Sequence, residues 1–495
     1  MSRINTNVPS LLAQRVLGMQ NKSLVTSLER LSTGLRINRG ADDPAGLIAS
    51  ENLRAEKTAI SAAISNAERA EQVANVAEGG LQEISSMLLE LQSLVGSTAN
   101  DAGISAEEKD ANQLQVDSIL QTIDRVANST SFNGTKLLNG NFDYTTSNVA
   151  TGLEDVSIQS ARLSDASGSY INVTIDVTTS AQTGAVYLST QGTLVNGDNG
   201  SITVEITGMD GVQQFTFASG TTQANIIDAI NTFSDALGVS ATQAVTDTDK
   251  VEINSRTYGS DQYVRIKVLE GTSNTLIADA DSTTDGTKTD YKDYGRDAVV
   301  LINGNAATTD GLTARVATDG FDVTITLDGD LASGSGGINT TGGSSTFQIT
   351  GGGADFNLAP KVNLAGKVSL GIETSTTGNL GDDIDGFLSA LKSGGTANVV
   401  NGDLTKAQKI VDNAIRQVSS LRGRLGAFTK NTVGSTINNL GVTLENTAAA
   451  ESVIRDADFA VETAALTRQQ IMTQAATQAL SIANVQPQQV LSLLG

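Results

Sequence analysis

Two stretches decide the fold of this chain: LQEISSMLLELQSLV (81–95) and LTKAQKIVDNAIRQVSSLRGRLGAF (404–428). In both, apolar residues recur at steps of three and four, which predicts one apolar face along each of two α-helices. Neither face is hidden from water without a partner helix. The apolar positions are Leu81, Ile84, Leu88, Leu91 and Val95, and Leu404, Ala407, Val411, Ala414, Val418, Leu421, Leu425 and Phe428. The two ends of the chain are therefore expected to form two halves of one helical bundle.

Composition removes most kinds of catalysis from consideration. The chain of 495 residues has no Cys and no His, so thiolate chemistry is excluded and the commonest general base near neutral pH is missing. The commonest metal ligand is missing as well. We therefore expect no cofactor, no metal site and no enzyme.

The net charge of −22 is unevenly distributed along the sequence. Residues 1–140 carry −4 and residues 401–495 carry +1, which leaves −19 on the middle, from 12 basic and 31 acidic side chains. An acidic middle repels phosphate groups, so neither nucleic acid nor an anionic membrane is expected as a partner. The nearly neutral ends are able to associate without that repulsion.

No targeting or membrane segment is recognisable in the sequence. No stretch reaches the roughly 18 to 20 continuous apolar residues that a membrane span needs. At the N-terminus, Pro9, Ser10, Gln14 and Arg15 interrupt any apolar core of a secretory signal. The protein is expected to be cytosolic, or to leave the cell by a route that reads no cleavable signal.

The N-terminal 140 residues are predicted to be helical. A heptad-like row runs to about residue 40 and should break at Gly40, where Asp42, Asp43 and Pro44 supply the cap and first turn of a second helix. That helix should reach about Asn100. The row consists of Leu17, Leu24, Leu28, Leu31 and Leu35. A shorter helix with Val116, Leu120, Ile123 and Ala127 follows, and then SFNGTKLLNG (131–140) predicts turns and short strands.

In the middle, the apolar period changes from 3.6 to 2, which predicts strands with one wet face. Such strands are expected around residues 171–177, 202–206 and 321–327, with a helix from Asn225 to Leu237. Residues 201–222 resemble the stretch from Ala298 to Leu327, which suggests two related small α/β units.

The C-terminal part is predicted to be helical again from Leu404 onward. Gly441 should interrupt it, and a break is expected near Arg455 to Asp458. The last segment carries one apolar stripe, formed by Met472, Ala475, Ala479 and Ile482.

Both ends resemble bacterial flagellin, the subunit of the flagellar filament. LSTGLRINRGADDPAGLIAS (31–50) and SFNGTKLLNG (131–140) resemble its N-terminal signatures. STINNL (435–440), IRDADFAVETAALTRQQIMTQAATQAL (454–480) and NVQPQQVLSLLG (484–495) resemble its C-terminal ones. The resemblance covers roughly 1–140 and 400–495.

The resemblance implies a multidomain α + β protein that polymerises with itself into an extracellular flagellum. Residues 1–40 plus 455–495 would form an inner coiled coil lining the channel, and 41–140 plus 400–454 the surrounding helical tube. Residues 141–399 would be the acidic, β-rich outer surface. It further implies the flagellar export apparatus, a C-terminal export chaperone, the filament cap and hook-associated proteins as partners.

The sequence also indicates which apolar residues would carry assembly. The stripes allow the core of a monomeric bundle as the alternative, but the first and last 40 residues have no third helix to cover them. The expected positions in the inner coiled coil are Leu17, Leu24, Leu28, Leu31, Leu35, Met472, Ala475, Ala479 and Ile482, with Leu88, Leu91, Leu421 and Leu425 in the tube.

Two acidic motifs allow a metal-site interpretation beside a simpler one. Asp42 and Asp43 stand just before a helix, where carboxylates cap the positive end of its dipole, so caps are favoured over ligands. DADSTTDG (279–286) loosely resembles a calcium loop, but it lacks the spacing and the closing Glu of an EF-hand. A solvated loop is therefore favoured there.

Arg422, Arg424 and Lys430 form a basic group in the C-terminal arm. They indicate either a solvated helix face or ion pairs, within or between subunits, to an acidic neighbour such as Glu83 or Glu90. Pairs of this kind contribute about 0–1 kcal/mol each, so they would set register more than strength.

The resemblance also locates the patch that the innate immune receptor for flagellin grips, centred on an Arg and a Glu. Those places fall on Glu90 and Gln115 here. Because the first substitution reverses the charge, we expect receptor recognition to be weak or absent.

Two rivals remain open. A hook–filament junction protein shares the terminal signatures, and the middle is compatible with an adhesin or a surface enzyme borne on a filament. Long homogeneous fibres would dismiss the first, and glycan binding by residues 141–400 would support the second.

Overall fold

The computed structural model describes residues 6–100, 103–150, 152–163, 170–189, 201–218, 220–244, 250–270, 277–279, 290–329, 343–382 and 385–492. The chain divides into two compact units. The first contains Met1–Glu71, Asn357–Gly366 and Phe428–Gly495, and the second contains Gln72–Phe356 and Lys367–Ala427. No helix in the described part of the chain has both the length and the apolar character needed to cross a membrane.

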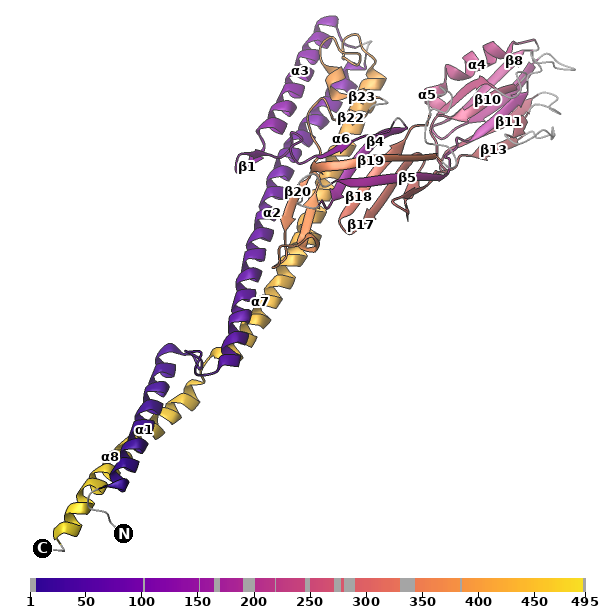
Figure 1. Cartoon of the computed structure of the whole chain (residues 1–495). Helices are drawn as coiled ribbons and strands as arrows, with labels where there is room; N and C mark the ends of the chain where they lie inside the picture. Colours follow the sequence, from indigo (N-terminus) through magenta and orange to yellow (C-terminus); the bar gives the residue numbers. More distant parts are fainter. Residues whose placement is uncertain are drawn as a thin grey trace. The chain divides into compact units, whose positions relative to one another are not determined.

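The first unit is helical (Figure 1). Here α1 packs against α8, and α2 packs against α7 around Ile60, Ala63 and Leu440. Its elements are α1 (Val8–Thr33), the first part of α2 (Pro44–Thr98), the short η1 (Leu364–Gly366), the π-helical turn η3 (Phe428–Val433), α7 (Gly434–Arg455) and α8 (Phe459–Ser492).

Helix ends in this unit follow from local capping. The predicted extension of the first helix to Gly40 is wrong, because Gly34 adopts φ 73° and its N–H binds the carbonyl of Arg30, which closes α1. The predicted start at Pro44 and the break after Arg455 are confirmed. The predicted interruption at Gly441 is wrong, because α7 continues through it and the irregular turn is η3 instead.

The second unit contains a helical column made of the later part of α2, α3 (Ala106–Ser129) and α6 (Leu404–Ala427). Ser105 and Glu108 form a capping box that starts α3. Gln92 of α2 donates to Asp412 of α6 at 2.8 Å. The predicted apolar faces lie inside the column, where they exclude water between the helices. Their buried members include Leu81, Ile84, Leu88, Val116, Leu120, Ile123, Val411, Val418 and Leu425.

A tight hairpin follows α3, as the sequence predicts for residues 131–140. It consists of β1 (Ser131–Phe132) and β2 (Thr135–Lys136), which pair antiparallel. The turn residues Asn133 and Gly134 have φ of 49° and 83°, the conformation that an Asn-Gly pair favours in two-residue hairpins.

Two antiparallel sheets form what we call the inner β unit, with strand orders β15-β14-β5-β19-β3 and β16-β17-β18-β4. Alternate residues of these strands build one apolar core, which includes Val173, Ile175, Ile325 and Phe347. The strands are β3 (Tyr144–Ser147), β4 (Leu153–Ala161), β5 (Ile171–Thr179), β14 (Val299–Ile302), β15 (Asn305–Ala306), β16 (Thr308–Asp310), β17 (Thr313–Thr318), β18 (Phe321–Leu327) and β19 (Gly343–Gly352).

A second pair of sheets forms the outer β unit, with strand orders β12-β6-β10-β9 and β13-β11-β7-β8. Its core includes Val204, Phe215, Ile226 and Ile266. The predicted helix from Asn225 to Leu237 is broken in two. The elements are β6 (Ala185–Ser189), β7 (Ser201–Thr207), β8 (Val212–Ala218), α4 (Gln223–Asn231), α5 (Ser234–Leu237), β9 (Val239–Gln243), β10 (Lys250–Ser255), β11 (Tyr263–Glu270), β12 (Ile277–Asp279) and β13 (Asp290–Tyr294).

The stretches expected to be duplicated fall in different β units, 201–222 in the outer and 298–327 in the inner. Within the described residues, a helix belongs only to the outer core. Short elements return the chain from the inner β unit to α6. They are β20 (Ala354–Asn357) paired with β21 (Lys367–Leu370), β22 (Gly381–Asp382) paired with β23 (Gly386–Phe387), and η2 (Leu388–Leu391).

Candidate functional site

The terminal helices α1 and α8 run antiparallel. Near one end of the pair, the hydroxyl of Ser10 donates to Asn484 Oδ1 at 2.6 Å. Near the other end, Arg30 lies 4.0 Å from Glu462. The two ends of the sequence are therefore held side by side within one chain.

The covered face of each terminal helix follows a heptad rhythm of alternating three and four residues. Many side chains on these faces are small or polar, so the pair buries little apolar area. On α1 they are Ser10, Ala13, Leu17, Gln20, Leu24, Ser27 and Leu31; on α8 they are Glu462, Leu466, Gln469, Thr473, Ala476, Leu480 and Ala483.

The five leucines expected in the N-terminal row differ in their burial and in their place on the helix. Leu17, Leu24 and Leu31 lie half-buried on the covered face of α1. Leu28 is 47 % exposed and points away from that face. Leu35 lies beyond the end of α1, because Gly34 closes the helix, and it forms an isolated bridge with Asp456.

On α8, the stripe predicted to pack in the seam is displaced by one residue. Met472, Ala475, Ala479 and Ile482 each precede a member of the covered row by one position, which turns them about 100° around the helix. They are exposed, Met472 at 46 % and Ile482 at 71 %. The prediction that these four residues pack between α1 and α8 of one chain is therefore wrong. The covered row is built from smaller residues such as Ala476, which let the two helices approach closely.

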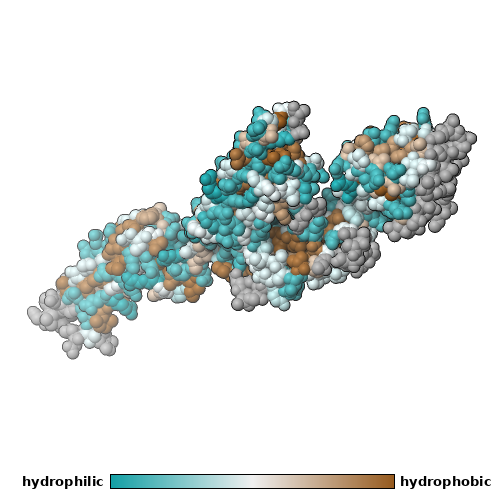
Figure 2. Space-filling view, turned by 90° about the horizontal axis from the view of Figure 1, so that it is seen from above, coloured by the Kyte–Doolittle hydropathy of each residue, from teal (hydrophilic) through white to brown (hydrophobic). Residues whose placement is uncertain are grey.

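Exposed apolar side chains lie along both terminal helices. Figure 2 shows hydrophobic residues at the surface of this part of the chain. Isolated apolar residues on a surface need no explanation, but rows of them mark a surface that another protein covers. The exposed residues are Val8, Leu11, Leu12, Met19, Val25 and Leu28 on α1, and Phe459, Val461, Ile471, Met472, Ile482 and Val485 on α8.

Leu88, Leu91, Leu421 and Leu425 lie elsewhere, inside the helical column. Their exposed fractions are 0 %, 0 %, 3 % and 0 %. They therefore hold α2 and α6 together within one chain, and none of them is open to a second chain.

Arg422 pairs with an acidic residue of α2, although not with one of those expected. Its guanidinium lies 4.0 Å from Glu78. Because α2 and α6 run antiparallel, Glu83 and Glu90 lie opposite earlier residues of α6, so the suggested pairs with them within one subunit are wrong.

The other two basic residues of this group also differ from expectation. Arg424 pairs with Glu373 at 3.1 Å, in the segment that returns from the inner β unit. Lys430 is exposed and makes no ion pair with any described residue.

The paired carboxylates before α2 act on the backbone, as the capping interpretation predicts for Asp43. Its Oδ1 accepts the N–H of Gly46 at 2.9 Å, within the first turn of α2. Asp42 accepts the N–H groups of Arg39 at 2.9 Å and Asn38 at 3.1 Å, and these bonds, Arg39 first, lower the pKa of Asp42. The described residues contain no group of three side chains suited to hold a metal ion.

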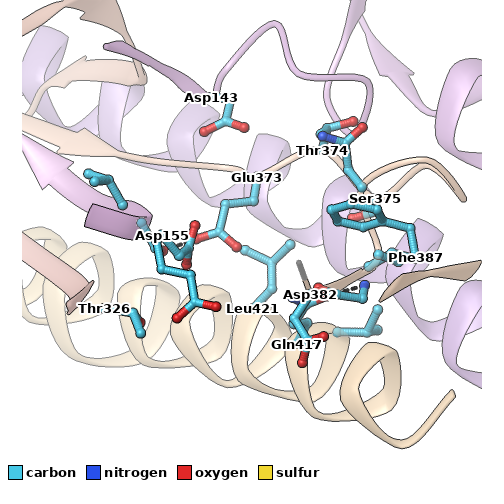
Figure 3. Close-up of a pocket in the computed structure, with 17 residues that line it drawn as sticks. Asp143, Asp155, Thr326, Glu373, Thr374, Ser375, Asp382, Phe387, Gln417 and Leu421 are labelled. Atoms are coloured by element: carbon cyan, nitrogen blue, oxygen red, sulfur yellow. Dashed lines mark hydrogen bonds between the residues drawn. The ribbon is translucent and has the colours of Figure 1, made fainter. Parts of the chain in front are cut away.

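A cavity of about 410 Å³ lies between β4, α6 and the returning segment (Figure 3). Burial and then the nearby Glu373 raise the pKa of Asp143. Hydrogen bonding and ion pairing are the chemistry that this lining offers. Its carboxylates are Asp143, Glu154, Asp155, Glu373 and Asp382. The calcium-like motif 279–286 is separate and, apart from Asp279, lies outside the described residues.

Both helical ends match family models of known proteins. Residues 4–143 match "Bacterial flagellin N-terminal helical region" and residues 408–494 match "Bacterial flagellin C-terminal helical region". The flagellin of Salmonella typhimurium is 30 % identical over 540 aligned positions, covering 99 % of this chain and 99 % of that protein. This chain belongs to the bacterial flagellin family.

Other flagellins align over the same extent. Flagellin A of Helicobacter pylori is 29 % identical over 539 positions, and the B-type flagellin of Pseudomonas aeruginosa is 30 % identical over 513. Each alignment covers 99 % of both proteins. This flagellin is therefore a structural protein, a subunit of the extracellular flagellar filament.

The two positions onto which the resemblance maps the receptor patch are both exposed in this flagellin. Glu90 lies on α2 and Gln115 on α3, each beside an exposed leucine, Leu89 at 55 % and Leu114 at 70 %. Both side chains are therefore accessible at the surface of the described part of the chain.

Several exposed residues of this flagellin's terminal helices were missed by the sequence reasoning. Leu11, Leu12 and Val25 on α1, and Val461 and Ile471 on α8, lie outside the predicted rows. A test for a second apolar row on each helix, beside the one that faces the partner, would have found them.

Proposed function

We propose that the exposed apolar rows of α1 and α8 bind the same helices of neighbouring copies, and that this contact drives polymerisation. The observation that carries the proposal is the exposure of Leu11, Val25, Ile471 and Ile482 on helices whose mutual seam is small and polar. Within one chain these side chains remain exposed to solvent. Neighbouring copies would cover them.

The energetic argument follows from area. Apolar burial stabilises by about 25 cal/mol per Å², and a specific protein interface hides on the order of 1,600 Å² in total. Each subunit of a tube has several such contacts. The polymer is then far more stable than the lone terminal pair, since binding favours the ordered state by mass action.

We propose a layered arrangement in the filament. Residues 1–40 plus 455–495 line the channel, 41–140 plus 400–454 form the tube, and 141–399 face solvent. The charge of −19 on the middle part supports this order, because like charges at the outer surface keep a fibre soluble.

We further propose that the chain leaves the cell through the flagellar export apparatus without a cleavable signal peptide. A C-terminal export chaperone, the filament cap and hook-associated proteins are its expected partners. The exposed apolar row of α8 supports a chaperone, because it needs a cover before assembly. A Cys-free chain also forms no premature disulfide on the way.

Recognition by the innate immune receptor is proposed to be weak. Glu90 is exposed and carries the charge opposite to the Arg of the family's patch. A cell reporter assay with a standard flagellin as reference tests this, and equal potency would refute it.

The assembly proposal is tested by dissociating filaments with heat, cooling the protein and viewing the product by negative-stain microscopy. The full chain should form long homogeneous fibres, which a junction protein acting in few copies would not. A variant lacking residues 1–40 and 455–495 should form none. A variant lacking residues 186–294 is the matched control and should still polymerise. Normal fibres from the first variant would contradict the proposal.

A further inference from the structure

Two chain segments connect the helical column to the inner β unit, and we call them the neck: residues 138–144 and 371–377. They are hydrogen-bonded to each other, from Ile372 N–H to the Phe142 carbonyl at 2.9 Å and from Ser375 N–H to the Leu138 carbonyl at 2.9 Å. The neck is thus a narrow, two-segment connection.

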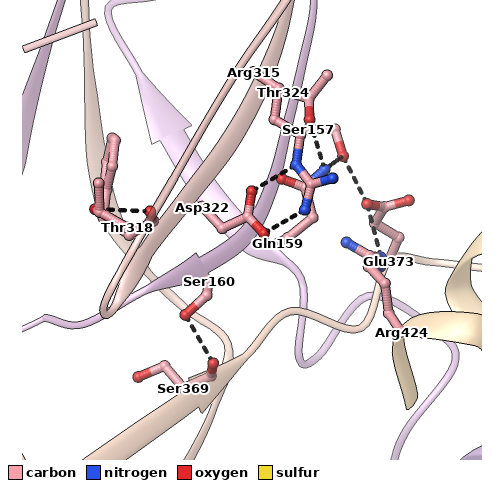
Figure 4. A network of polar contacts seen from close by, with 11 residues as sticks. Ser157, Gln159, Ser160, Arg315, Thr318, Asp322, Thr324, Ser369, Glu373 and Arg424 are labelled. Carbon is pink, nitrogen blue, oxygen red and sulfur yellow. Dashed lines mark hydrogen bonds and ion pairs between the residues drawn. The ribbon is translucent and has the colours of Figure 1, made fainter. Parts of the chain in front are cut away.

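Glu373 in the neck binds both of the parts that the neck connects (Figure 4). Its Oε1 accepts the hydroxyl of Ser157, on β4, at 2.7 Å. The same oxygen accepts Nη2 of Arg424, on α6, at 3.1 Å. One carboxylate therefore links the sheet to the column.

Little else fills the space around this link. The cavity of about 410 Å³ is lined by residues of β4, of α6, of the neck and of the β22–β23 hairpin. At this place β4 and α6 face each other across the cavity instead of packing directly. Arg424 also has two buried nitrogens, Nε and Nη1, that have no hydrogen-bond partner among the described residues. The guanidinium depends on Glu373 for the ion pair that offsets its burial.

The junction between the inner and outer β units differs from the neck because it is held together by direct backbone contacts. The backbones of Gln182 and Arg296 exchange two hydrogen bonds of 2.8 Å, and Gly295 N–H binds the Gln262 carbonyl at 2.9 Å. A side chain at Gly295 would meet the carbonyl oxygen of Gly259 at 2.4 Å. Chain segments around residues 182, 260 and 296 are thus in direct backbone contact.

Asp297 fastens this second junction further. Its carboxylate accepts the Ser260 N–H at 2.8 Å, the Ser260 hydroxyl at 2.6 Å and the Gly311 N–H at 2.9 Å. Burial opposes ionisation of Asp297, but these bonds together outweigh it and lower the pKa of the group. The carboxylate therefore stays ionised and bonded down to acidic pH.

We propose that the neck is a hinge, that Glu373 is its latch, and that the two β units move on it as one body. Motion concentrates where few groups are packed, and the cavity leaves room for the sheet to tilt against α6. The hinge is a property of the single subunit and does not depend on the proposed polymerisation.

The chain has no native Cys, so paired spin labels can be placed without background. One pair spans the neck, from Ser420→Cys on α6 to Ala317→Cys on β17. The other pair spans the junction of the two β units, from Ala317→Cys to Gln214→Cys on β8. All three positions are exposed. Pulsed electron paramagnetic resonance on the full-length monomer gives the distance distribution of each pair.

The expected result is a broader distribution across the neck than across the β-unit junction. Glu373→Gln keeps the shape but removes the charge, and should broaden only the neck distribution. Ser157→Ala cuts the sheet side of the latch and should do the same. Amide exchange of residues 138–144 and 371–377 should rise by about tenfold in both variants.

Asp319→Asn is the matched control, because Asp319 forms a 3.0 Å pair with Arg162 on the same β unit, belongs to neither side of the latch, and is 92 % exposed. It should change neither distribution. Equal widths in the parent chain overturn the proposal. So does an unchanged neck distribution in Glu373→Gln, or in Ser157→Ala if the first variant does not fold.

Discussion

Asp124 and Thr377, 253 residues apart in sequence, are joined by two hydrogen bonds. Asp124 Oδ1 accepts the Thr377 N–H at 2.8 Å, and Oδ2 accepts the Thr377 hydroxyl at 2.9 Å. Lys392 reaches the same carboxylate at 3.6 Å. This contact holds the last residue of the neck against α3.

Replacing Asp124 should therefore loosen the column. Asp124→Ala leaves a backbone N–H and a hydroxyl without their acceptor, and is expected to lower the free energy of unfolding by about 1–3 kcal/mol. Urea unfolding followed by circular dichroism measures it. Asp110→Ala, at an exposed acidic position of the same helix, should change the value by less than about 0.5 kcal/mol. Equal effects of the two would contradict the role given to Asp124.

Gly371 is predicted to tolerate no side chain. A Cβ there would lie 2.5 Å from the Ile158 carbonyl oxygen and 2.9 Å from the ring of Tyr144. Gly371→Ala should cost about 1–3 kcal/mol in calorimetric unfolding, as overpacking does. At Gly378, a Cβ would meet nothing within 4 Å, so Gly378→Ala serves as the control. A loss no larger than that of the control would show that the backbone yields easily.

Burial raises the pKa of Tyr144 to about 12, from an ordinary value of 10.0. Its phenol binds both backbone groups of Ala161, accepting the N–H at 2.9 Å and donating to the carbonyl at 3.2 Å. The backbone bond to Ala161 opposes the shift, but burial outweighs it, so the folded state favours the neutral phenol. That stabilisation is complete below pH 10 and is lost as the pH rises toward 12, in total about 2–3 kcal/mol.

Titration of tyrosinate absorbance checks this value. Burial also raises the pKa of Tyr187 to about 12. Tyr144→Phe should remove one ionisation near pH 12, and Tyr187→Phe should remove another. If Tyr144→Phe instead removes an ionisation near pH 10, the burial argument fails for this side chain.

A substitution at Ile482 is expected to affect assembly without affecting the folding of the monomer. It is 71 % exposed, so Ile482→Ser should alter the unfolding free energy of the monomer by less than about 0.5 kcal/mol. If neighbouring copies cover this side chain, polymer yield after sedimentation should fall several-fold. Gln478→Ser, at another exposed position of α8, should sediment like the parent. Normal polymerisation of Ile482→Ser would remove this residue from the proposed interface.

The helical elements were largely predictable because their signals are local. Pro44 marks the start of α2 as expected, and the Asn-Gly pair at 133–134 forms the predicted turn. The Asp and Pro residues after Gly40 predict the end of α1 there, but Gly34 comes first and closes the helix. When two helix-terminating signals follow each other, the one that comes first in the sequence determines where the helix ends.

The apolar face of α8 was harder to predict, since apolar residues occupy two adjacent rows. Hydrophobicity predicts that the row with the larger apolar residues, Met472 and Ile482, faces the partner helix. In the structure the smaller row, with Ala476 and Ala483, faces α1. Hydrophobicity alone therefore does not show which face of a helix packs closely against its partner helix in the same chain and which face is left for another chain.

The latch at Glu373 carries no sequence signal at all. Its partners lie 216 and 51 residues away, and no motif marks any of the three. Only the return of the chain from the inner β unit to α6 brings Ser157, Glu373 and Arg424 together. Contacts of this kind follow from topology, which local patterns do not encode.

The reciprocal backbone pair between Gln182 and Arg296 has a consequence for how such proteins diversify. The chain enters and leaves the outer β unit at adjacent points. The whole unit is therefore an insertion that can be removed or exchanged as one piece. Excising it and bridging the ends with a short turn is expected to leave the remaining sheets in register, and a foreign domain with adjacent termini can take its place. Sequence length there can change freely while the rest of the subunit keeps its shape.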